Sequence, residues 1–148
     1  MRIERCSEMC DGWIALRCKL WPECDASVHR EDARGLIARD SEALVVLARS
    51  DAGVVVGFAE AALRRDYVNG CSTSPVAFLE GIYVEPEFRR QAVARRLCAE
   101  VQRWGVDAGC TEFASDSLLD NESAHVVHRA LGFTETERVV YFRKPLDA

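Results

Sequence analysis

The residues best suited to chemistry lie between Val84 and Ala94, where an apolar strand pattern gives way to a long helical one. A strand that runs into the first turn of a helix aims unpaired backbone N–H groups and the positive end of the helix dipole at one point. Such a point can bind a phosphate or pyrophosphate group. Arginines surround it in this otherwise acidic chain: Arg89, Arg90, Arg95 and Arg96. We interpret the segment as a phosphate-binding turn, with a solvated, arginine-rich helix start as the alternative.

The spacing of apolar residues predicts the elements that must position this turn. We expect strands at Arg2–Cys6, Ala43–Arg49, Val54–Arg64, Val76–Val84 and Cys110–Ser115, and a final strand within Phe133–Arg143. We expect helices at about Cys10–Trp21, Val28–Arg39 and Ala92–Ala108, and one from the capping pair Asp120-Asn121 to Leu131. Gly81, inside a strand, indicates a bulge or a close ligand approach. The order βααβββαβαβ predicts one mixed α/β (α+β) domain over residues 1–148.

The composition of the chain limits the kinds of molecule that we expect it to bind. The net charge of −5 argues against nucleic acid and suits a cationic ligand, although acidity can also serve solubility alone. No stretch reaches the roughly 18 apolar residues of a membrane span, and the amino terminus lacks an apolar leader, so we expect a soluble, cytoplasmic chain. The seven cysteines show no C-x-x-C spacing. They therefore predict neither disulfides nor a metal site.

Several motifs resemble the GCN5-related N-acetyltransferase (GNAT) superfamily over essentially the whole chain. The superfamily pattern is carried by Pro86-x-x-Arg89-x-x-x-x-Ala94, by Asn121-x-x-Ala124 and by Leu131-Gly132-Phe133. Four longer runs are similar to the chromosomal aminoglycoside 6′-N-acetyltransferases of enteric bacteria and Acinetobacter. These runs are Asp66–Cys71, Phe78–Ile82, Ala114–Asp116 and Ala130–Arg138.

The resemblance implies a GNAT fold, with a mostly antiparallel central sheet flanked by helices, that uses acetyl-CoA and forms a homodimer. It implies that the backbone of Ile82, Tyr83 and Val84 holds the pantetheine and acetyl group. The implied pyrophosphate loop comprises Arg89, Arg90, Gln91, Ala92, Val93 and Ala94, and Asn121 matches a further cofactor contact. The family pattern has glycine where Ala92 stands here. A Cβ there disfavours positive φ and crowds the phosphate, at a cost on the order of 1 kcal/mol.

The resemblance also places an antibiotic site at Trp21, Tyr67, Glu80, Asp116 and Glu137. An indole, a phenol and three carboxylates could wrap a sugar that bears several ammonium groups. The alternatives are surface charge for the carboxylates and ordinary packing for the two aromatic residues.

Acetyl transfer to an amine requires that the amine lose a proton, and we assign that role, or the positioning of a water that performs it, to Glu80 or Asp116. Backbone N–H groups near Gly81 could stabilise the oxyanion. His128 occupies the position of a tyrosine that protonates the departing thiolate in many family members, although it could simply be a polar residue at a helix edge. We expect His29 and His125 at the surface and assign no cysteine as a nucleophile.

The sequence thus favours direct acetyl transfer, within a ternary complex, to the 6′-amine of an aminoglycoside. Two alternatives stay open. One is a GNAT enzyme for another small polyamine or amino sugar, and the other is a binding module whose cofactor loop Ala92 has weakened.

Overall fold

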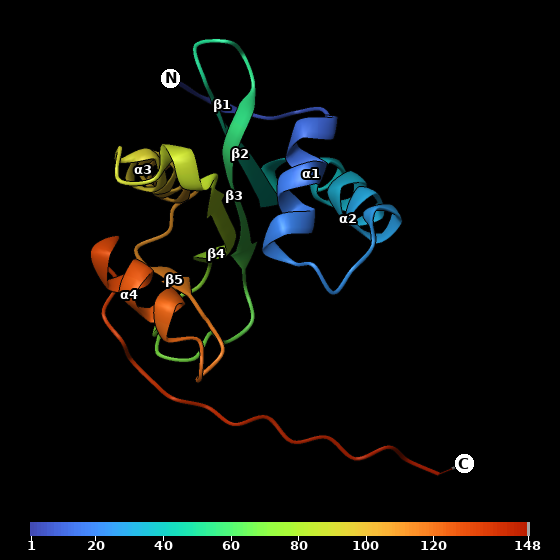
Figure 1. Cartoon of the computed structure of the whole chain (residues 1–148). Coiled ribbons are helices and arrows are strands. Elements are labelled where there is room, and N and C mark those ends of the chain that lie inside the picture. Colours follow the sequence, from blue (N-terminus) through green and yellow to red (C-terminus); the bar gives the residue numbers. More distant parts are fainter. Residues whose placement is uncertain (148) are drawn as a thin grey trace.

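Five strands form one sheet in the order β1-β2-β3-β4-β5 (Figure 1). The computed structural model describes residues 1–147. The strands are β1 (Arg2–Arg5), β2 (Ala43–Arg49), β3 (Val55–Arg64), β4 (Val76–Val84) and β5 (Phe113–Ser115). The first three junctions are antiparallel and the β4–β5 junction is parallel. This confirms the expected mixed, mostly antiparallel sheet.

Helices cover both faces of the sheet. The helices are α1 (Asp11–Leu20), α2 (Ala26–Ala38), α3 (Val93–Asp107) and α4 (Glu122–Ala130), with short 3-10 turns η1 (Asp40–Glu42) and η2 (Pro86–Phe88). In Figure 1, α1 and α2 lie on one side of the strands and α3 lies on the other. The helix α2 begins two residues before the predicted Val28, because the carboxylate of Asp25 accepts a hydrogen bond from the Val28 N–H at 3.1 Å and caps the first turn.

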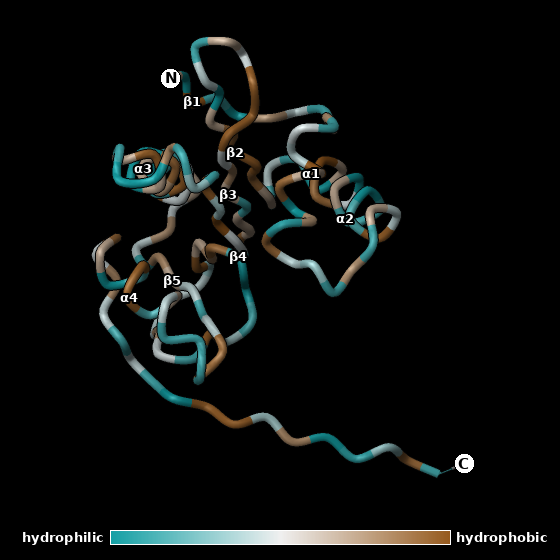
Figure 2. The backbone as a smooth tube through the Cα atoms, in the orientation of Figure 1, coloured by the Kyte–Doolittle hydropathy of each residue, from teal (hydrophilic) through white to brown (hydrophobic). Residues whose placement is uncertain are grey.

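Two hydrophobic clusters hold these layers together. The α3 side buries Leu97, Val101 and Trp104 against β2, β3 and β4. The α1 and α2 side buries Trp13 and Phe58. Figure 2 shows hydrophobic colour on β2 and on parts of α1 and α3, and again on a separate stretch of the chain near the C-terminus.

The predicted final strand within Phe133–Arg143 is wrong: residues 133–147, here called the C-terminal tail, carry no regular secondary structure. The Phe133 ring at the start of the tail packs against Phe113, and the far end of the tail extends away from the body of the protein (Figure 1). The segment has strand-like composition, but a strand forms only where a neighbouring backbone supplies hydrogen bonds. Within the described residues β5 borders only β4, and no other strand lies beside the tail.

The expected surface position of His29 is also wrong. Only 1% of this residue is exposed, because α2 packs against α1 and presses the imidazole beneath Trp21. His125 is half-buried, and its Nε2 lies 3.0 Å from the carbonyl oxygen of Leu118.

Candidate active site

The strands β4 and β5 run together for only three residues and then diverge. Ala77–Leu79 pair with Phe113–Ser115, after which β5 ends while β4 continues to Val84. Beyond Leu79, β4 has no strand neighbour on that side within the described residues. Gly81, Ile82 and Tyr83 are accordingly half-buried, whereas Val76–Leu79 are buried. Their backbone groups can therefore serve an extended ligand, as the resemblance implied for Ile82–Val84.

A bulge in β4 directs Glu80 outward. Glu60 pairs with Gly81 while Ala61 pairs with Leu79, so Glu80 is the extra residue. This confirms the irregularity expected from Gly81, since a bulge re-aims a side chain. The carboxylate of Glu80 binds Arg64, with Nη2 to Oε2 at 2.9 Å, and the Arg64 guanidinium lies 3.5 Å from the centre of the Phe78 ring. Sequence reasoning missed Arg64, although its place at the end of β3, opposite β4, could have indicated a partner for Glu80.

The turn before α3 has the geometry of an anion cradle. Ala92 caps the helix with φ 60°, and Arg90 has φ 61°. The Arg96 N–H donates to the carbonyl of Ala92, the cap residue of α3, at 3.0 Å. The N–H groups between Ala92 and Arg96 have no helical carbonyl to bind, so they are left for solvent or a ligand. Ala92 therefore stands in the left-handed conformation that the family pattern reserves for glycine.

The side chains of this turn do not all point outward. The Nε of Arg89 donates to the Val84 carbonyl at 2.8 Å, and its guanidinium lies 5.6 Å from the centre of the Tyr83 ring. Arg89 thus ties the turn to the end of β4. Arg90 and Gln91 are exposed, and the side-chain amide of Gln91 donates to the Glu87 carbonyl at 3.2 Å.

A cavity of about 790 Å³ opens between the end of β5, α4, the loop at residues 65–75 and the C-terminal tail. Its lining brings together Tyr67, Asp116, His128 and Glu137. Glu80 lies outside the lining but binds Arg64, which is part of it. Tyr67 is 75% exposed, which fits contact with a ligand better than core packing.

Trp21 lies next to the bulge rather than in this cavity. It is half-buried at the end of α1, and a Cβ built on Gly81 would stand 2.5 Å from its ring. Only glycine fits under this indole. Of the five predicted substrate residues, the structure gathers three around the cavity. It sets the Trp21 ring over Gly81, and Glu80 is the residue next to Gly81 in β4.

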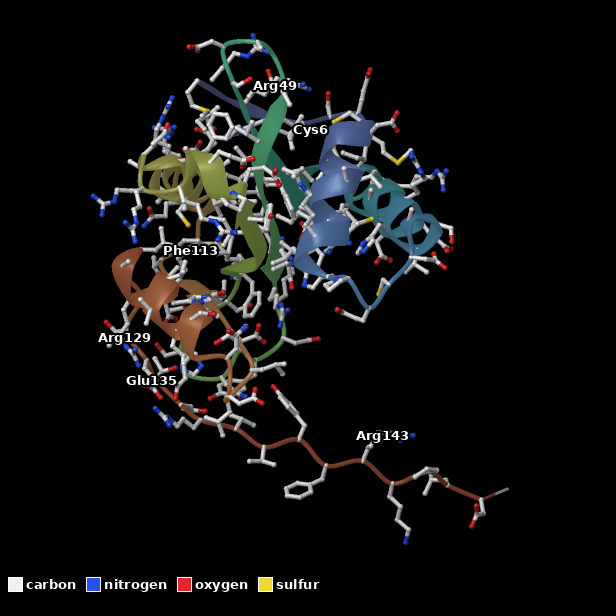
Figure 3. The ribbon with its side chains drawn as sticks, in the orientation of Figure 1. Cys6, Arg49, Phe113, Arg129, Glu135 and Arg143 are labelled. Carbon is white, nitrogen blue, oxygen red and sulfur yellow. The ribbon has the colours of Figure 1, made fainter. Side chains whose placement is uncertain are left out.

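Polar contacts hold both the loop that carries Tyr67 and the start of the tail, which line the same cavity. The carboxylate of Glu112 accepts from the backbone N–H of Ser72 at 2.9 Å and of Thr73 at 2.8 Å. Hydrogen bonds from Thr73 and Ser72 lower the pKa of Glu112. In Figure 3, Arg129 of α4 and Glu135 lie together where the tail begins, with Nη2 and Oε2 3.6 Å apart.

His128 reaches from α4 to the point where the strands part. Its Nδ1 lies 2.6 Å from the Ala124 carbonyl oxygen and its Nε2 lies 2.8 Å from Ser115 Oγ. Ser115 Oγ can itself donate to the Leu79 carbonyl at 3.1 Å. When Nε2 carries a proton, the imidazole donates to Ser115 and the hydroxyl donates to Leu79; when Nε2 is bare, the hydroxyl can turn and donate to it. The arrangement accommodates both states of a proton donor.

Asn121 has a structural role in the described chain. Its side-chain oxygen accepts from the Ala124 N–H at 3.2 Å and so caps α4. A cofactor contact would use its amide nitrogen. Among residues 1–147, no cluster of three or more His, Cys, Asp or Glu side chains could hold a metal ion.

Comparison with known proteins identifies the class: residues 7–133 match the acetyltransferase (GNAT) family, and the chain belongs to it. It is 52% identical over 132 residues to aminoglycoside N(6′)-acetyltransferase type 1 of Acinetobacter baumannii, covering 89% of each chain. It is 53% identical over 136 residues to the protein of that description from Stenotrophomonas maltophilia, covering 92% of this chain and 87% of that one.

Solved structures agree with the sequence matches. The apo aminoglycoside antibiotic 6′-N-acetyltransferase AAC(6′)-IG from Acinetobacter haemolyticus superposes with a TM-score of 0.94 at 47% identity, covering 99% of this chain and 100% of that one. AAC(6′)-Iy in complex with the bisubstrate analogue CoA-S-monomethyl-acetylneamine superposes with a TM-score of 0.89 at 44% identity, covering 98% of each chain.

Proposed function

We propose that this chain transfers the acetyl group of acetyl-CoA to the 6′-amine of aminoglycoside antibiotics, by direct attack within a ternary complex. The observation that carries the proposal is the divergence of β4 and β5 after Leu79 and Ser115. The positive-φ turn at Ala92 follows β4 in the chain, and the cavity that holds Asp116 and His128 lies at the end of β5. The chain is identical to aminoglycoside N(6′)-acetyltransferases at about half of the aligned positions, which supports the same activity.

Acetyl-CoA, when bound, supplies the acetyl thioester. The residues present fit it: the turn from Arg89 to Ala94 offers N–H groups and the helix dipole to the pyrophosphate, and the unpaired edge of Ile82–Val84 offers backbone groups to the pantetheine. Arg90 and Gln91 are exposed beside that turn and can reach phosphate oxygens, while Arg89 holds the turn in place through Val84.

The acceptor is proposed to lie against Tyr67, Asp116 and Glu137, with Glu80 and Trp21 beside it at the bulge. Ammonium groups on an aminoglycoside complement these carboxylates. Arg64 already forms an ion pair with Glu80. A substrate ammonium group must therefore share this carboxylate with the Arg64 guanidinium or displace the guanidinium from it. Asp116 forms no ion pair within residues 1–147.

Two proton movements accompany the transfer. As the new C–N bond forms and the C–S bond breaks, the amine proton passes to Asp116 or Glu80, directly or through water. The departing sulfur takes a proton from His128, either directly or through the Ser115 hydroxyl to which His128 is hydrogen-bonded. Backbone N–H groups of β4 next to the bulge stabilise the oxyanion.

A homodimer is proposed from exposed apolar surface. The tail exposes 83% of Tyr141 and 92% of Phe142. The helix α4 has no buried residue, and Val126 and Val127 are exposed on it. Apolar surface of this kind is normally covered by a partner, and the strand-like tail could pair with the sheet of a second copy.

A cytoplasmic location is proposed with it, because seven cysteines without a disulfide suit a reducing compartment. Among residues 1–147 no helix has both the length and the apolar content to cross a membrane.

The decisive experiment measures acetyl-CoA turnover with kanamycin-type sugars, linear polyamines and peptides as acceptors. Fast turnover with product acetylated at the 6′-amine supports the proposal. Preference for a polyamine or another amino sugar would reassign the substrate. Binding of acetyl-CoA or an aminoglycoside without turnover would identify a non-catalytic module, the alternative that the alanine at position 92 favours.

A further inference from the structure

A charged cluster lies buried on the α1 side of the bulge and takes no part in the transfer described above. It comprises Arg17, His29 and Glu60, here called the Arg17 cluster. Their exposed fractions are 5%, 1% and 2%. Neither composition nor helical spacing predicted that these three groups would meet, because they come from α1, α2 and β3.

The cluster is fully hydrogen-bonded. The Arg17 guanidinium binds both carboxylate oxygens of Glu60, and Trp13 Nε1 donates to the same carboxylate at 2.9 Å. Arg17 Nε donates to His29 Nδ1 at 3.3 Å. Burial raises the pKa of Glu60, whereas the bonds from Arg17 and Trp13 favour its charged form.

Such a cluster needs a reason other than stability. Desolvation of a buried ion pair offsets much of its attraction, and replacement by apolar residues of similar size is often neutral or stabilising. The buried pair does, however, hold its partners in one fixed geometry, because each donor and acceptor has a defined direction.

Two members of the Arg17 cluster contact Trp21. The Arg17 guanidinium lies 4.8 Å from the centre of the Trp21 ring, and the His29 ring stacks on the Trp21 ring with centroids 6.3 Å apart. His29 Nε2 lies 3.0 Å from the Trp21 carbonyl oxygen. Because Arg17 can only donate to Nδ1, the Nε2 atom carries a hydrogen and donates to that carbonyl. Both the ring and the backbone of Trp21 are thus fixed.

The same cluster lies under the bulge. Glu60 is the residue of β3 that pairs with Gly81, immediately before the register shift that sends Glu80 outward. Gly81 in turn is the residue over which the Trp21 ring passes. One buried carboxylate therefore connects the two substrate-site residues that lie outside the main cavity.

We propose that Arg17, Glu60 and His29 are positioning residues, which set the Trp21 indole against Gly81 and so shape the part of the acceptor site next to the bulge. The inference rests on the proposed function only for its kinetic consequence. The position of the indole itself can be measured without any substrate.

The test compares two variants with the wild type. Arg17→Met with Glu60→Gln removes both buried charges together, and the only charged partner that it leaves is Asp32, whose half-exposed carboxylate lies 3.5 Å from Arg17 and keeps contact with solvent. His29→Leu removes the hydrogen bond to the Trp21 carbonyl. We expect the aminoglycoside KM to rise about fivefold in each, with the acetyl-CoA KM changed less than about twofold. Both variants should also increase quenching by iodide of the fluorescence that Trp21→Phe removes.

A double-mutant cycle separates positioning from loss of stability. In a Trp21→Ala background, the same changes should raise the aminoglycoside KM no further, because their effect passes through the indole. Val46→Ala is the matched control: this residue is fully buried in the α3-side cluster, and its truncation should lower the melting temperature without a KM effect.

Equal KM increases with and without Trp21, or equal increases for both substrates, would overturn the positioning role. Unchanged exposure of Trp21 to iodide in both variants would also overturn it. If Trp21→Ala itself leaves the aminoglycoside KM unchanged while the quenching result holds, the positioning of the indole stands and the placement of Trp21 in the acceptor site is wrong.

Discussion

Thr136 lies directly against the α-carbon of Gly70, so that a Cβ at residue 70 would meet the Thr136 Cβ at 2.6 Å. This contact joins the loop that carries Tyr67 to the segment that carries Glu137. These two walls of the cavity can therefore lie this close together only because Gly70 has no side chain.

Gly70→Ala should separate these walls. Gly70 has φ +82°, so alanine costs about 1 kcal/mol for its backbone conformation and in addition displaces Thr136. We expect the aminoglycoside KM to rise while acetyl-CoA affinity stays constant. Gly53→Ala is the control, since Gly53 has φ +83° with open space around it. A KM change of similar size in the control would show that backbone strain, rather than the contact with Thr136, is responsible.

Asp116→Asn should weaken the aminoglycoside more than Glu80→Gln does. Arg64 already neutralises Glu80, whereas Asp116 has no ion-pair partner among residues 1–147. Neither change should alter acetyl-CoA affinity by a comparable factor. Steady-state KM values at rising ionic strength provide the measurement, and they should increase for the wild type because salt screens partly exposed charges. A flat salt response, or parallel losses for both substrates, would contradict an electrostatic acceptor site.

Ala92→Gly should raise stability and acetyl-CoA affinity by separate routes. Ala92 has φ 60° without ligand, so glycine relieves backbone strain of about 1 kcal/mol that shows in the melting temperature. Removal of the Cβ beside the phosphates should tighten the binding of acetyl-CoA by up to roughly tenfold, as measured by calorimetry.

Arg90→Ala should weaken acetyl-CoA binding if its side chain reaches a phosphate. Arg89→Ala should weaken it through loss of the tie to Val84. Unchanged affinity in all three variants would remove the pyrophosphate assignment.

His128→Phe should lower kcat, by about a hundredfold where protonation of the thiolate limits the rate. Ser115→Ala should give a smaller loss if His128 reaches the sulfur directly, and a comparable loss if the hydroxyl relays the proton. Steady-state kcat of both variants and the wild type provides the measurement. A variant of His128 with unchanged kcat would show that the thiolate leaves without a dedicated acid.

Phe142→Asp in the tail should weaken self-association, because a charge on a covered apolar surface is costly. Sedimentation at several concentrations measures the fraction of dimer. Val106→Asp on α3 is the matched control, as Val106 is 70% exposed on another face. A wild type that sediments as a monomer at all concentrations would exclude the dimer.

The elements that bury one face were predictable from sequence. The strand Ala43–Arg49 was predicted to the residue, and the bulge near Gly81 followed from a glycine in a strand. The tail was not predictable, because apolar alternation signals a strand without saying which backbone will pair with it. The environment of His29 was missed for a related reason. Its partner Arg17 lies 12 residues away in sequence, and Glu60, which binds Arg17, lies 31 residues away, so no local spacing indicates that the three meet. The roles of Ser115 and Arg64 likewise could not be predicted from sequence, because each depends on a residue in a neighbouring strand.

The brevity of β5 has a consequence for how the site holds its shape. Three parallel pairs attach β5 to the sheet, and α4, which follows it, buries no residue completely. By contrast, α3 buries Val93, Leu97, Cys98 and Val101 against the sheet. Local opening should therefore cost less free energy around β5 and α4 than around α3. The turn proposed to hold the nucleotide is thus attached to the more firmly packed helix, and Asp116 and His128 lie in a part of the chain that should open more easily.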